Sequence, residues 1–125
     1  MTRILIVDDS QMTRNFHTYV LRSAGFDVID ASDGAEALEI LYREGNIDCI
    51  ITDLNMPNVD GFTMIKRIRE DPVFTDLPII IVSTLDEIKD KEKGFTIGAN
   101  FYIIKPIVPQ VLVEHVRIAV GGNKG

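Results

Sequence analysis

The sequence predicts an α/β domain built on a parallel sheet that helices cover on both faces. Short runs of Ile, Leu and Val alternate with longer segments of helical period, at a spacing of roughly 25 residues. The runs are continuously apolar, which is typical of strands buried on both faces. With 125 residues, 46% of them hydrophobic, the chain has the length and core content of one domain. We place this domain over residues 1–120 and expect a flexible tail over 121–125.

Two strand–helix units open the pattern. A strand over 3–7 precedes a helix that Ser10 can cap and Gly25 can end. Four apolar residues fall at helical spacing on one side of this helix: Met12, Phe16, Tyr19 and Val20. Residues 27–31 predict a second, less apolar strand, and the helix that follows it is closed by Gly45.

Three further units complete the pattern. The remaining strands share Ile-rich or aromatic composition and cover 48–53, 79–83 and 101–104. A helical segment follows each of them, over 61–70, 86–97 and 109–120. Asp60 can cap the first of these helices, Pro72 limits its length, and Gly98 can stop the second.

The charge balance and the length of the apolar runs exclude several functions. Thirteen Lys and Arg against 19 Asp and Glu give a net charge of -6, which argues against nucleic-acid binding through a basic surface. No apolar run approaches the ~20 residues of a membrane helix, and the N-terminus lacks the features of a signal peptide. The single Cys49 excludes a disulfide scaffold. We therefore expect a cytoplasmic protein that binds neither nucleic acid nor membrane.

Polar and charged side chains follow four of the predicted strands. Ligands of open parallel sheets bind outside the carboxyl ends of the strands, so we expect these side chains to share one crevice. They are Asp8 and Asp9 after the first strand, Asp53 and Asn55 after the third, Ser83 and Thr84 at the end of the fourth, and Lys105 after the fifth.

Three aspartates in one crevice call for a cation. Two like charges ~4 Å apart repel by roughly 4 kcal/mol at an effective dielectric constant of 20, and one lysine does not balance three carboxylates. Mg²⁺ prefers oxygen ligands and needs only one or two carboxylates. One aspartate is then left to act as a nucleophile and to form an aspartyl-phosphate.

With these residues in place, the sequence resembles the two-component response-regulator receiver domain, of the stand-alone CheY-like type. The resemblance covers essentially the whole chain and leaves no room for an output domain. It implies a flavodoxin-like (βα)5 fold with strand order 2-1-3-4-5. The motifs that carry it are Ile4 to Ser10, Asp53 to Pro57, Asp60-Gly61, Val82-Ser83, Gly98 to Asn100 and Lys105-Pro106.

The resemblance assigns a role to each residue that matches the family motif. Asp53 matches the phosphoacceptor, and Asp8 and Asp9 match the acidic pair that holds Mg²⁺ beside it. Asn55 matches the position whose backbone carbonyl completes the metal shell.

Four further positions belong to the phosphoryl contacts and the switch, of which three match the family and one departs from it. Ser83 and Lys105 match the hydroxyl and the ammonium that contact the phosphoryl group. Tyr102 matches the aromatic switch position, whose ring turns inward as Ser83 moves. Thr84 departs from the small residue that is common there, and we expect it to narrow access to the phosphate. Two other departures, Asn100 and Ile107, do not touch the core chemistry.

The resemblance implies a signalling switch and not an enzyme. A histidine kinase or phosphotransfer protein would phosphorylate Asp53, and a downstream protein would read the change on the fourth helix, fifth strand and fifth helix. The chain could also be an intermediate of a phosphorelay. From the residues alone, a phosphohydrolase of the haloacid-dehalogenase type stays open, although its Asp-x-Asp after the first strand is not matched by the adjacent Asp8 and Asp9. We expect His17 and His115 at the surface, because neither has a partner at metal-ligand spacing.

Overall fold

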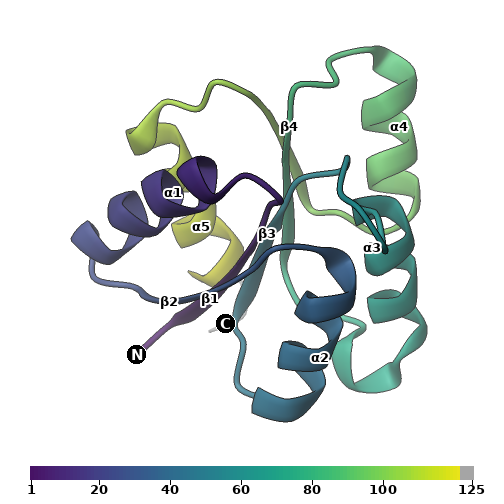
Figure 1. Ribbon diagram of the computed structural model, residues 1–125, viewed down its shortest axis with the longest axis horizontal. Coiled ribbons are helices and arrows are strands. Elements are labelled where there is room, and N and C mark those ends of the chain that lie inside the picture. Colours follow the sequence, from purple (N-terminus) through teal and green to yellow (C-terminus); the bar gives the residue numbers. More distant parts are fainter. Residues whose placement is uncertain (122–125) are drawn as a thin grey trace.

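Residues 1–121, which the computed structural model describes, contain one parallel sheet of five strands (Figure 1). The strands are β1 (Arg3–Val7), β2 (Asp27–Ala31), β3 (Cys49–Thr52), β4 (Ile79–Ser83) and β5 (Phe101–Ile104). Their order is β2-β1-β3-β4-β5, which confirms the expected flavodoxin-like topology. Val7 pairs with Thr52, so the central strands β1 and β3 end at the same level.

Helices cover both faces of the sheet. They are α1 (Gln11–Ser23), α2 (Gly34–Glu44), α3 (Gly61–Glu70), α4 (Ile88–Thr96) and α5 (Pro109–Gly121), with a short 3₁₀ turn, η1 (Pro72–Phe74), after α3. α1 and α5 pack on one face, and α2, α3 and α4 lie on the other (Figure 1). Among the described helices, none is both long and apolar enough to cross a membrane.

Alternate residues of the central strands point to opposite faces and form two apolar clusters. In β1, Ile4 and Ile6 pack with α1 and α5, whereas Leu5 and Val7 pack with α2 and α3. The sheet is therefore buried on both faces, as the continuous apolar runs predict. Cys49 is fully buried in the first cluster, and burial raises the pKa of its thiol to about 12, which suits an inert packing residue.

Local capping signals set the starts of three helices. Ser10 caps α1 by accepting a hydrogen bond from the backbone N–H of Thr13. Asp33 and Asp60 cap α2 and α3 in the same way, each bonding the N–H three residues further on. These bonds satisfy helix donors that would otherwise have no partner, and α1 and α3 start close to the residues expected from the sequence.

The side of α1 that packs on the sheet is not the side predicted from the spacing of Met12, Phe16 and Tyr19. The buried residues of this helix are His17, Val20 and Leu21. Met12 is 82% exposed, Tyr19 is 72% exposed, and Phe16 is also exposed. Apolar side chains lie on two adjoining sides of α1, and periodicity alone does not choose between them.

The prediction that both histidines lie at the surface is wrong for His17, which is only 3% exposed. His115 is half-buried: its ring meets the ring of Phe101 edge-on, with centroids 5.1 Å apart, and its Nδ1 lies 2.7 Å from the carbonyl oxygen of Val111. The bounds of three elements also differ from those expected. β3 covers Cys49–Thr52 and not 48–53, and α4 covers Ile88–Thr96 and not 86–97. α5 includes Gly121, while residues 122–125 of the expected tail lie outside the described residues.

Candidate functional site

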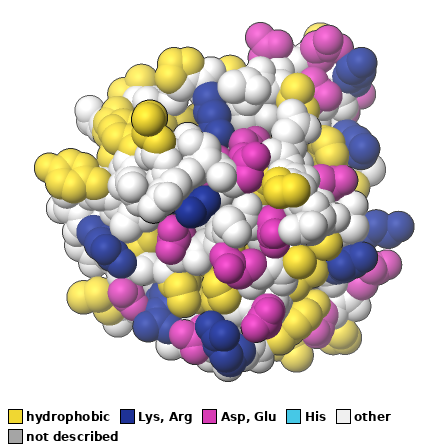
Figure 2. Space-filling view, viewed as in Figure 1, with side chains coloured by type: hydrophobic (Ala, Val, Ile, Leu, Met, Phe, Trp, Pro, Cys, Tyr) yellow, Lys and Arg dark blue, Asp and Glu magenta, His cyan; other side chains and the backbone are white. Residues whose placement is uncertain are grey.

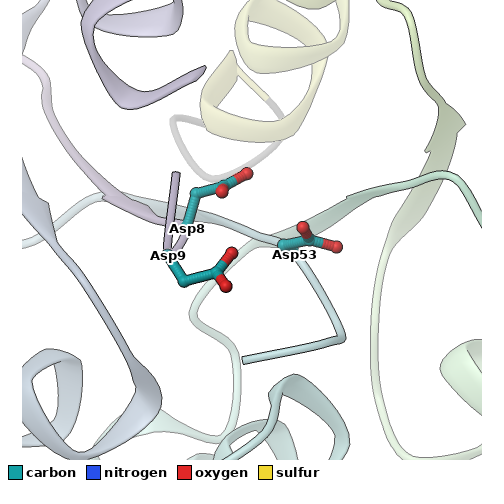
Figure 3. Close-up of side chains that lie close together, drawn as sticks. All are labelled: Asp8, Asp9 and Asp53. Atoms are coloured by element: carbon teal, nitrogen blue, oxygen red, sulfur yellow. The ribbon is translucent and has the colours of Figure 1, made fainter. Parts of the chain in front are cut away.

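Three aspartates converge at the carboxyl ends of β1 and β3. Asp8 and Asp9 follow β1 and Asp53 follows β3, at the level where Val7 and Thr52 pair. Each aspartate offers a carboxylate oxygen within 4.8 Å of the others. Figure 3 shows the three side chains gathered beyond the ends of the two strands. Asp8 is almost completely buried, Asp53 is partly buried, and Asp9 is exposed.

Lys105 joins two of these carboxylates. Its Nζ donates to Asp8 Oδ2 at 2.8 Å and to Asp53 Oδ2 at 3.0 Å. Burial acts to lower the pKa of Lys105, but the hydrogen bonds that Lys105 donates to Asp8 and Asp53, together with the negative charges of these carboxylates, outweigh it and raise this pKa above its ordinary value. Lys105 is therefore a cation at neutral pH, and its position depends on both carboxylates.

Backbone N–H groups orient the other oxygen of the same two carboxylates. The N–H of Ser10 donates to Asp8 Oδ1 at 2.8 Å, and the N–H of Leu54 donates to Asp53 Oδ1 at 2.7 Å. Arg14 adds a hydrogen bond of 2.7 Å from its guanidinium to the backbone oxygen of Asp8. These contacts fix the directions of the Asp8 and Asp53 side chains before any ligand binds.

A glycine lets the loop after β3 fold tightly against the first turn of α3. The N–H of Gly61 donates to the carbonyl oxygen of Leu54 at 2.9 Å. A Cβ at Gly61 would overlap the backbone oxygen of Asp53 and lie 2.9 Å from the Cα of Leu54. The Asp60-Gly61 pair of the sequence motif thus positions Asp53 through its backbone.

The donor set suits a divalent cation. Three carboxylates and one ammonium group leave two uncompensated negative charges within a few ångströms, so like-charge repulsion favours the binding of a cation. Carboxylate oxygens are hard ligands, which Mg²⁺ and Ca²⁺ prefer. Asp8, Asp9 and Asp53 could hold such an ion, and the structure thus offers the kind of metal site that the sequence predicts.

The remaining predicted residues surround the cluster at different depths. Ser83 ends β4, is fully buried, and its Oγ accepts a hydrogen bond from the N–H of Leu85 at 3.1 Å. Tyr102 lies in β5, and its hydroxyl donates to the carbonyl oxygen of Leu85 at 2.6 Å. Asn55 and Thr84 are exposed residues of the loops that follow β3 and β4.

Sequence reasoning missed a cavity beside Lys105. The cavity has a volume of about 570 Å³ and opens between α1 and the segment that follows β5. Its lining is largely apolar and includes Met12, Phe16, His17, Thr84, Pro106 and Ile107. One sequence signal could have indicated that His17 is buried: it precedes Val20 by three residues and Leu21 by four, which places it on the same, sheet-facing side of α1.

A doubly wound parallel sheet that gathers three carboxylates and a lysine at its carboxyl edge defines a class of protein: phosphoacceptor receiver domains. The chain belongs to the response regulator receiver domain family, whose model matches residues 4–117. It is a receiver of the CheY type, and a phosphoacceptor role in two-component signalling fits the aspartate cluster.

Relatives and solved structures agree with this membership along nearly the whole chain. The chain is 36% identical over 122 residues to the chemotaxis protein CheY1 of Helicobacter pylori, covering 97% of this chain and 98% of that protein. The structure of the chemotaxis protein CheY4 of Vibrio cholerae matches with a TM-score of 0.89 at 33% identity, covering 95% and 98%. The receiver domain of the Francisella response regulator 1452 matches with a TM-score of 0.90 at 31% identity, covering 98% and 99%.

Proposed function

We propose that this chain is a cytoplasmic response regulator in which Asp53 accepts a phosphoryl group, in a reaction that requires Mg²⁺. One observation carries the proposal: the Nζ of Lys105 bridges Asp8 and Asp53, while all three aspartates place oxygens within 4.8 Å of one another. A nucleophile, a fixed cation and a second cation site are thus side by side. Phosphoryl transfer depends mainly on such positioning and charge neutralisation.

The donor is a phosphohistidine of a kinase or phosphotransfer protein. An Asp53 carboxylate oxygen forms the new P–O bond as the P–N bond of the donor breaks, and the donor imidazole keeps the electron pair and takes up a proton. Lys105 lies 3.0 Å from Asp53 Oδ2, so a short movement pairs it with a phosphoryl oxygen. Mg²⁺ held by Asp8, Asp9, Asp53 and the backbone carbonyl of Asn55 would neutralise charge on the transferred group.

The chain acts as a switch whose catalytic contribution is limited to its own phosphorylation and dephosphorylation. Asp53 is modified once and must lose the phosphoryl group to water before it reacts again. The hydroxyl of Ser83, at the end of β4, moves to bond the phosphoryl group. Thr84, exposed beside the cavity that Lys105 lines, narrows the route of water to that group.

The phosphodonor protein docks beside the acidic cluster, over α1. Met12, Phe16 and Tyr19 form an exposed apolar ridge on this helix, and the cavity at Phe16 runs to Lys105. Figure 2 shows apolar side chains gathered on the side of the molecule where α1 and the start of α5 lie. This surface is continuous with the phosphorylation site, so it can seat an apolar helix that presents a phosphohistidine.

The downstream protein reads the surface formed by α4, β5 and α5. Tyr102 connects this surface to the pocket, because it belongs to β5 and bonds Leu85, two residues beyond Ser83. A phosphoryl group that draws Ser83 and Lys105 inward changes the packing of Tyr102 and α4. The partner binds one of the two packings better and so detects phosphorylation.

Replacing Asp53 tests the acceptor assignment. Asp53→Asn should abolish labelling by acetyl phosphate in the presence of Mg²⁺ while circular dichroism shows an intact fold. Asp76→Asn is the matched control, because Asp76 is an exposed aspartate remote from the strand ends, and it should be labelled like the wild type. Label retained by Asp53→Asn would place the acceptor elsewhere.

Mg²⁺ should raise the melting temperature of the wild type, because it offsets the repulsion among the three carboxylates. A ligand that binds only the folded chain stabilises it by about 2.7 kcal/mol at 100 times its dissociation constant. Thermal melts in EDTA and in excess Mg²⁺ measure this effect. A melting temperature unchanged by Mg²⁺ would contradict the metal site.

A further inference from the structure

The loop of residues 54–60, which joins β3 to α3, is anchored in the core only over its first part. Leu54 is buried, and its carbonyl oxygen accepts a hydrogen bond from the N–H of Gly61, which closes the base of the loop. The side chain of Met56 is buried as well. Residues 57–60 include no buried residue, so the place of this second part depends on other contacts.

Two hydrogen bonds tie the second part of the loop to the start of α2. The side-chain amide of Asn58 donates to Asp33 Oδ2 at 2.6 Å, and the N–H of Gly34 donates to the carbonyl oxygen of Val59 at 3.1 Å. Gly34 is the first residue of α2, so its N–H has no acceptor within the helix. Asp33 Oδ1 caps α2 by accepting from the N–H of Glu36, so one carboxylate serves both the helix and the loop.

The close approach of the loop requires a glycine at position 34. A Cβ there would overlap the carbonyl oxygen of Val59 and lie 2.9 Å from its Cγ1. Because that oxygen belongs to the backbone, the overlap is relieved only when the loop moves. Gly34 is not one of the glycines with positive φ in residues 1–121, so α2 itself would accept an alanine. The glycine therefore serves the contact with the loop and not the conformation of the helix.

Asn58 is adapted to the same contact from the loop side. Its φ of 65° is left-handed, and within residues 1–121 no other residue with a side chain has a positive φ. Asparagine adopts this conformation more readily than most residues, because its short polar side chain can form local hydrogen bonds. The bond to Asp33 is one of the surrounding contacts that hold such a backbone in place.

Asn55 lies between the buried Leu54 and the part of the loop that α2 holds. Its side chain is exposed, and within residues 1–121 no group donates a hydrogen bond to its carbonyl oxygen. A cation that binds this oxygen therefore displaces no partner. The position of the oxygen relative to the three aspartates depends on the anchors on either side of it.

We propose that Asp33 and Gly34 are positioning residues for the metal site: they hold Asn58 and Val59, and so fix the loop whose Asn55 carbonyl completes the shell of the cation. α2 supplies no ligand, yet its first turn sets the affinity of the site for Mg²⁺. The inference rests on the proposed function, in which Mg²⁺ binds the three aspartates and Asn55.

The dissociation constant for Mg²⁺ can be measured by NMR, from the backbone amide shifts of Asp53 and its neighbours in isotopically labelled protein. In Gly34→Ala the loop is displaced from α2, and we expect Mg²⁺ to bind about tenfold more weakly, as when groups that orient metal ligands are removed. Without Mg²⁺, the amide of residue 34 should exchange with solvent faster than in the wild type, because Val59 no longer accepts its hydrogen bond.

Gly45→Ala is the matched control at the other end of α2. Gly45 has a φ of 70°, and its Cβ would meet nothing within 4 Å. Alanine is strained there whatever the space, so the melting temperature should fall. The dissociation constant for Mg²⁺ and the exchange of the Gly34 amide should stay as in the wild type.

A double-mutant cycle tests the side-chain half of the contact, and it also serves if Gly34→Ala folds poorly. Asp33→Ser keeps a residue that caps helices but removes the carboxylate, and Asn58→Gly keeps the left-handed backbone but removes the amide. Each should weaken Mg²⁺ binding. Because both remove the same hydrogen bond, the double variant should bind Mg²⁺ no more weakly than the weaker single variant.

The outcomes distinguish this inference from the proposed function. Amide shifts of the wild type that do not respond to Mg²⁺ contradict the proposed function. A wild type that binds Mg²⁺, with Gly34→Ala binding it as tightly as Gly45→Ala does, overturns the positioning role of α2. Losses of affinity that add up in full in the double variant overturn it too, because the two side chains would then act independently.

Discussion

Charged side chains are arranged differently at the two edges of the sheet. At the carboxyl edge, Asp8, Asp9 and Asp53 lie together, and Lys105 forms ion pairs with Asp8 and Asp53. At the amino edge, Arg3 alone serves several acceptors. Its guanidinium bonds Asp27 at 2.8 Å and Asn46 at 3.2 Å and lies 3.5 Å from Glu44, and its backbone N–H bonds Asp48 at 2.8 Å.

A second arginine completes the amino edge. Arg69 of α3 donates to the carbonyl oxygens of Gly98 and Phe74 at 2.8 and 2.9 Å and to Asn100 Oδ1 at 3.1 Å. Asn100 Oδ1 also accepts from the N–H of Ile79 at the start of β4. Asn100, which departs from the aspartate of the family motif, thus serves as a shared acceptor at the amino edge.

The comparison separates structural charges from functional ones. Carboxylates also outnumber the cation around Arg3, but each of them contacts Arg3, and they are not among the described carboxylates that gather within 4.8 Å of one another. The three aspartates at the carboxyl edge carry more negative charge than Lys105 neutralises. Their repulsion destabilises the folded chain and favours the binding of a cation. A surplus of like charge at the ligand-binding end of a parallel sheet is therefore a better pointer to function than the number of charges.

The largest effect should come from removing Arg69. Arg69→Ala leaves the Gly98 and Phe74 carbonyl groups without their charged donor, and we expect a loss of about 2 kcal/mol in the free energy of unfolding. Urea denaturation measures this loss. Arg67→Ala is the control, because Arg67 is an exposed arginine on the same helix and should change stability little. Equal losses for both variants would contradict the structural role of Arg69.

Much of the fold could be predicted because it depends on local signals. The five strands were recognisable from apolar runs, and Ser10 and Asp60 marked helix starts that the structure shows. The buried side of α1 could not be predicted, because Met12 and Phe16 satisfy the helical period as well as the residues that are buried. The side of α1 that is buried packs against β1, β2 and α5, and α5 is distant from α1 in sequence.

An effect of intermediate size is the change in melting temperature when one aspartate at each edge is replaced, and this change should have opposite signs at the two edges. Asp9→Asn should raise the melting temperature in EDTA, because it removes one of three like charges whose repulsion is about 1 kcal/mol per pair in water at 4 Å. Asp27→Asn should lower the melting temperature, because it weakens the Arg3–Asp27 ion pair. Excess Mg²⁺ should raise the melting temperature of Asp9→Asn less than that of the wild type. Shifts of the same sign in EDTA would remove the contrast between the edges.

The acidic cluster was predictable for a topological reason. Parallel strands that start at one edge end at the other, so Asp8, Asp53 and Lys105 could be placed at the same edge once the strands were identified. Contacts such as the Tyr102 bond to Leu85, or the burial of His17, depend on side-chain packing between distant elements. No pattern along the chain records them, and the structure was needed to find them.

The smallest expected effect is a loss of stability as the pH falls, and it should begin at the carboxyl edge. Burial, with the Lys105 charge beside it, lowers the pKa of His17 from its ordinary 6.5, although Asp8 and Asp53 act against this shift. Below that ordinary value the unfolded chain binds the proton more readily than the folded one. The contribution of neutral His17 to the free energy of unfolding is therefore fully present above pH 6.5. It is lost as the pH falls through the pKa of His17 in the folded chain.

The amino edge should respond only to stronger acid. The hydrogen bond from Arg3 lowers the pKa of Asp27 from its ordinary 3.8, so the contribution of Asp27 is lost only as pH falls below that value. Urea unfolding at about pH 7 and pH 5 should show a decline in the wild type that His17→Phe reduces and Asp27→Asn does not. If Asp27→Asn reduces the decline and His17→Phe leaves it unchanged, acid acts first on the amino edge, and the contrast between the two edges fails.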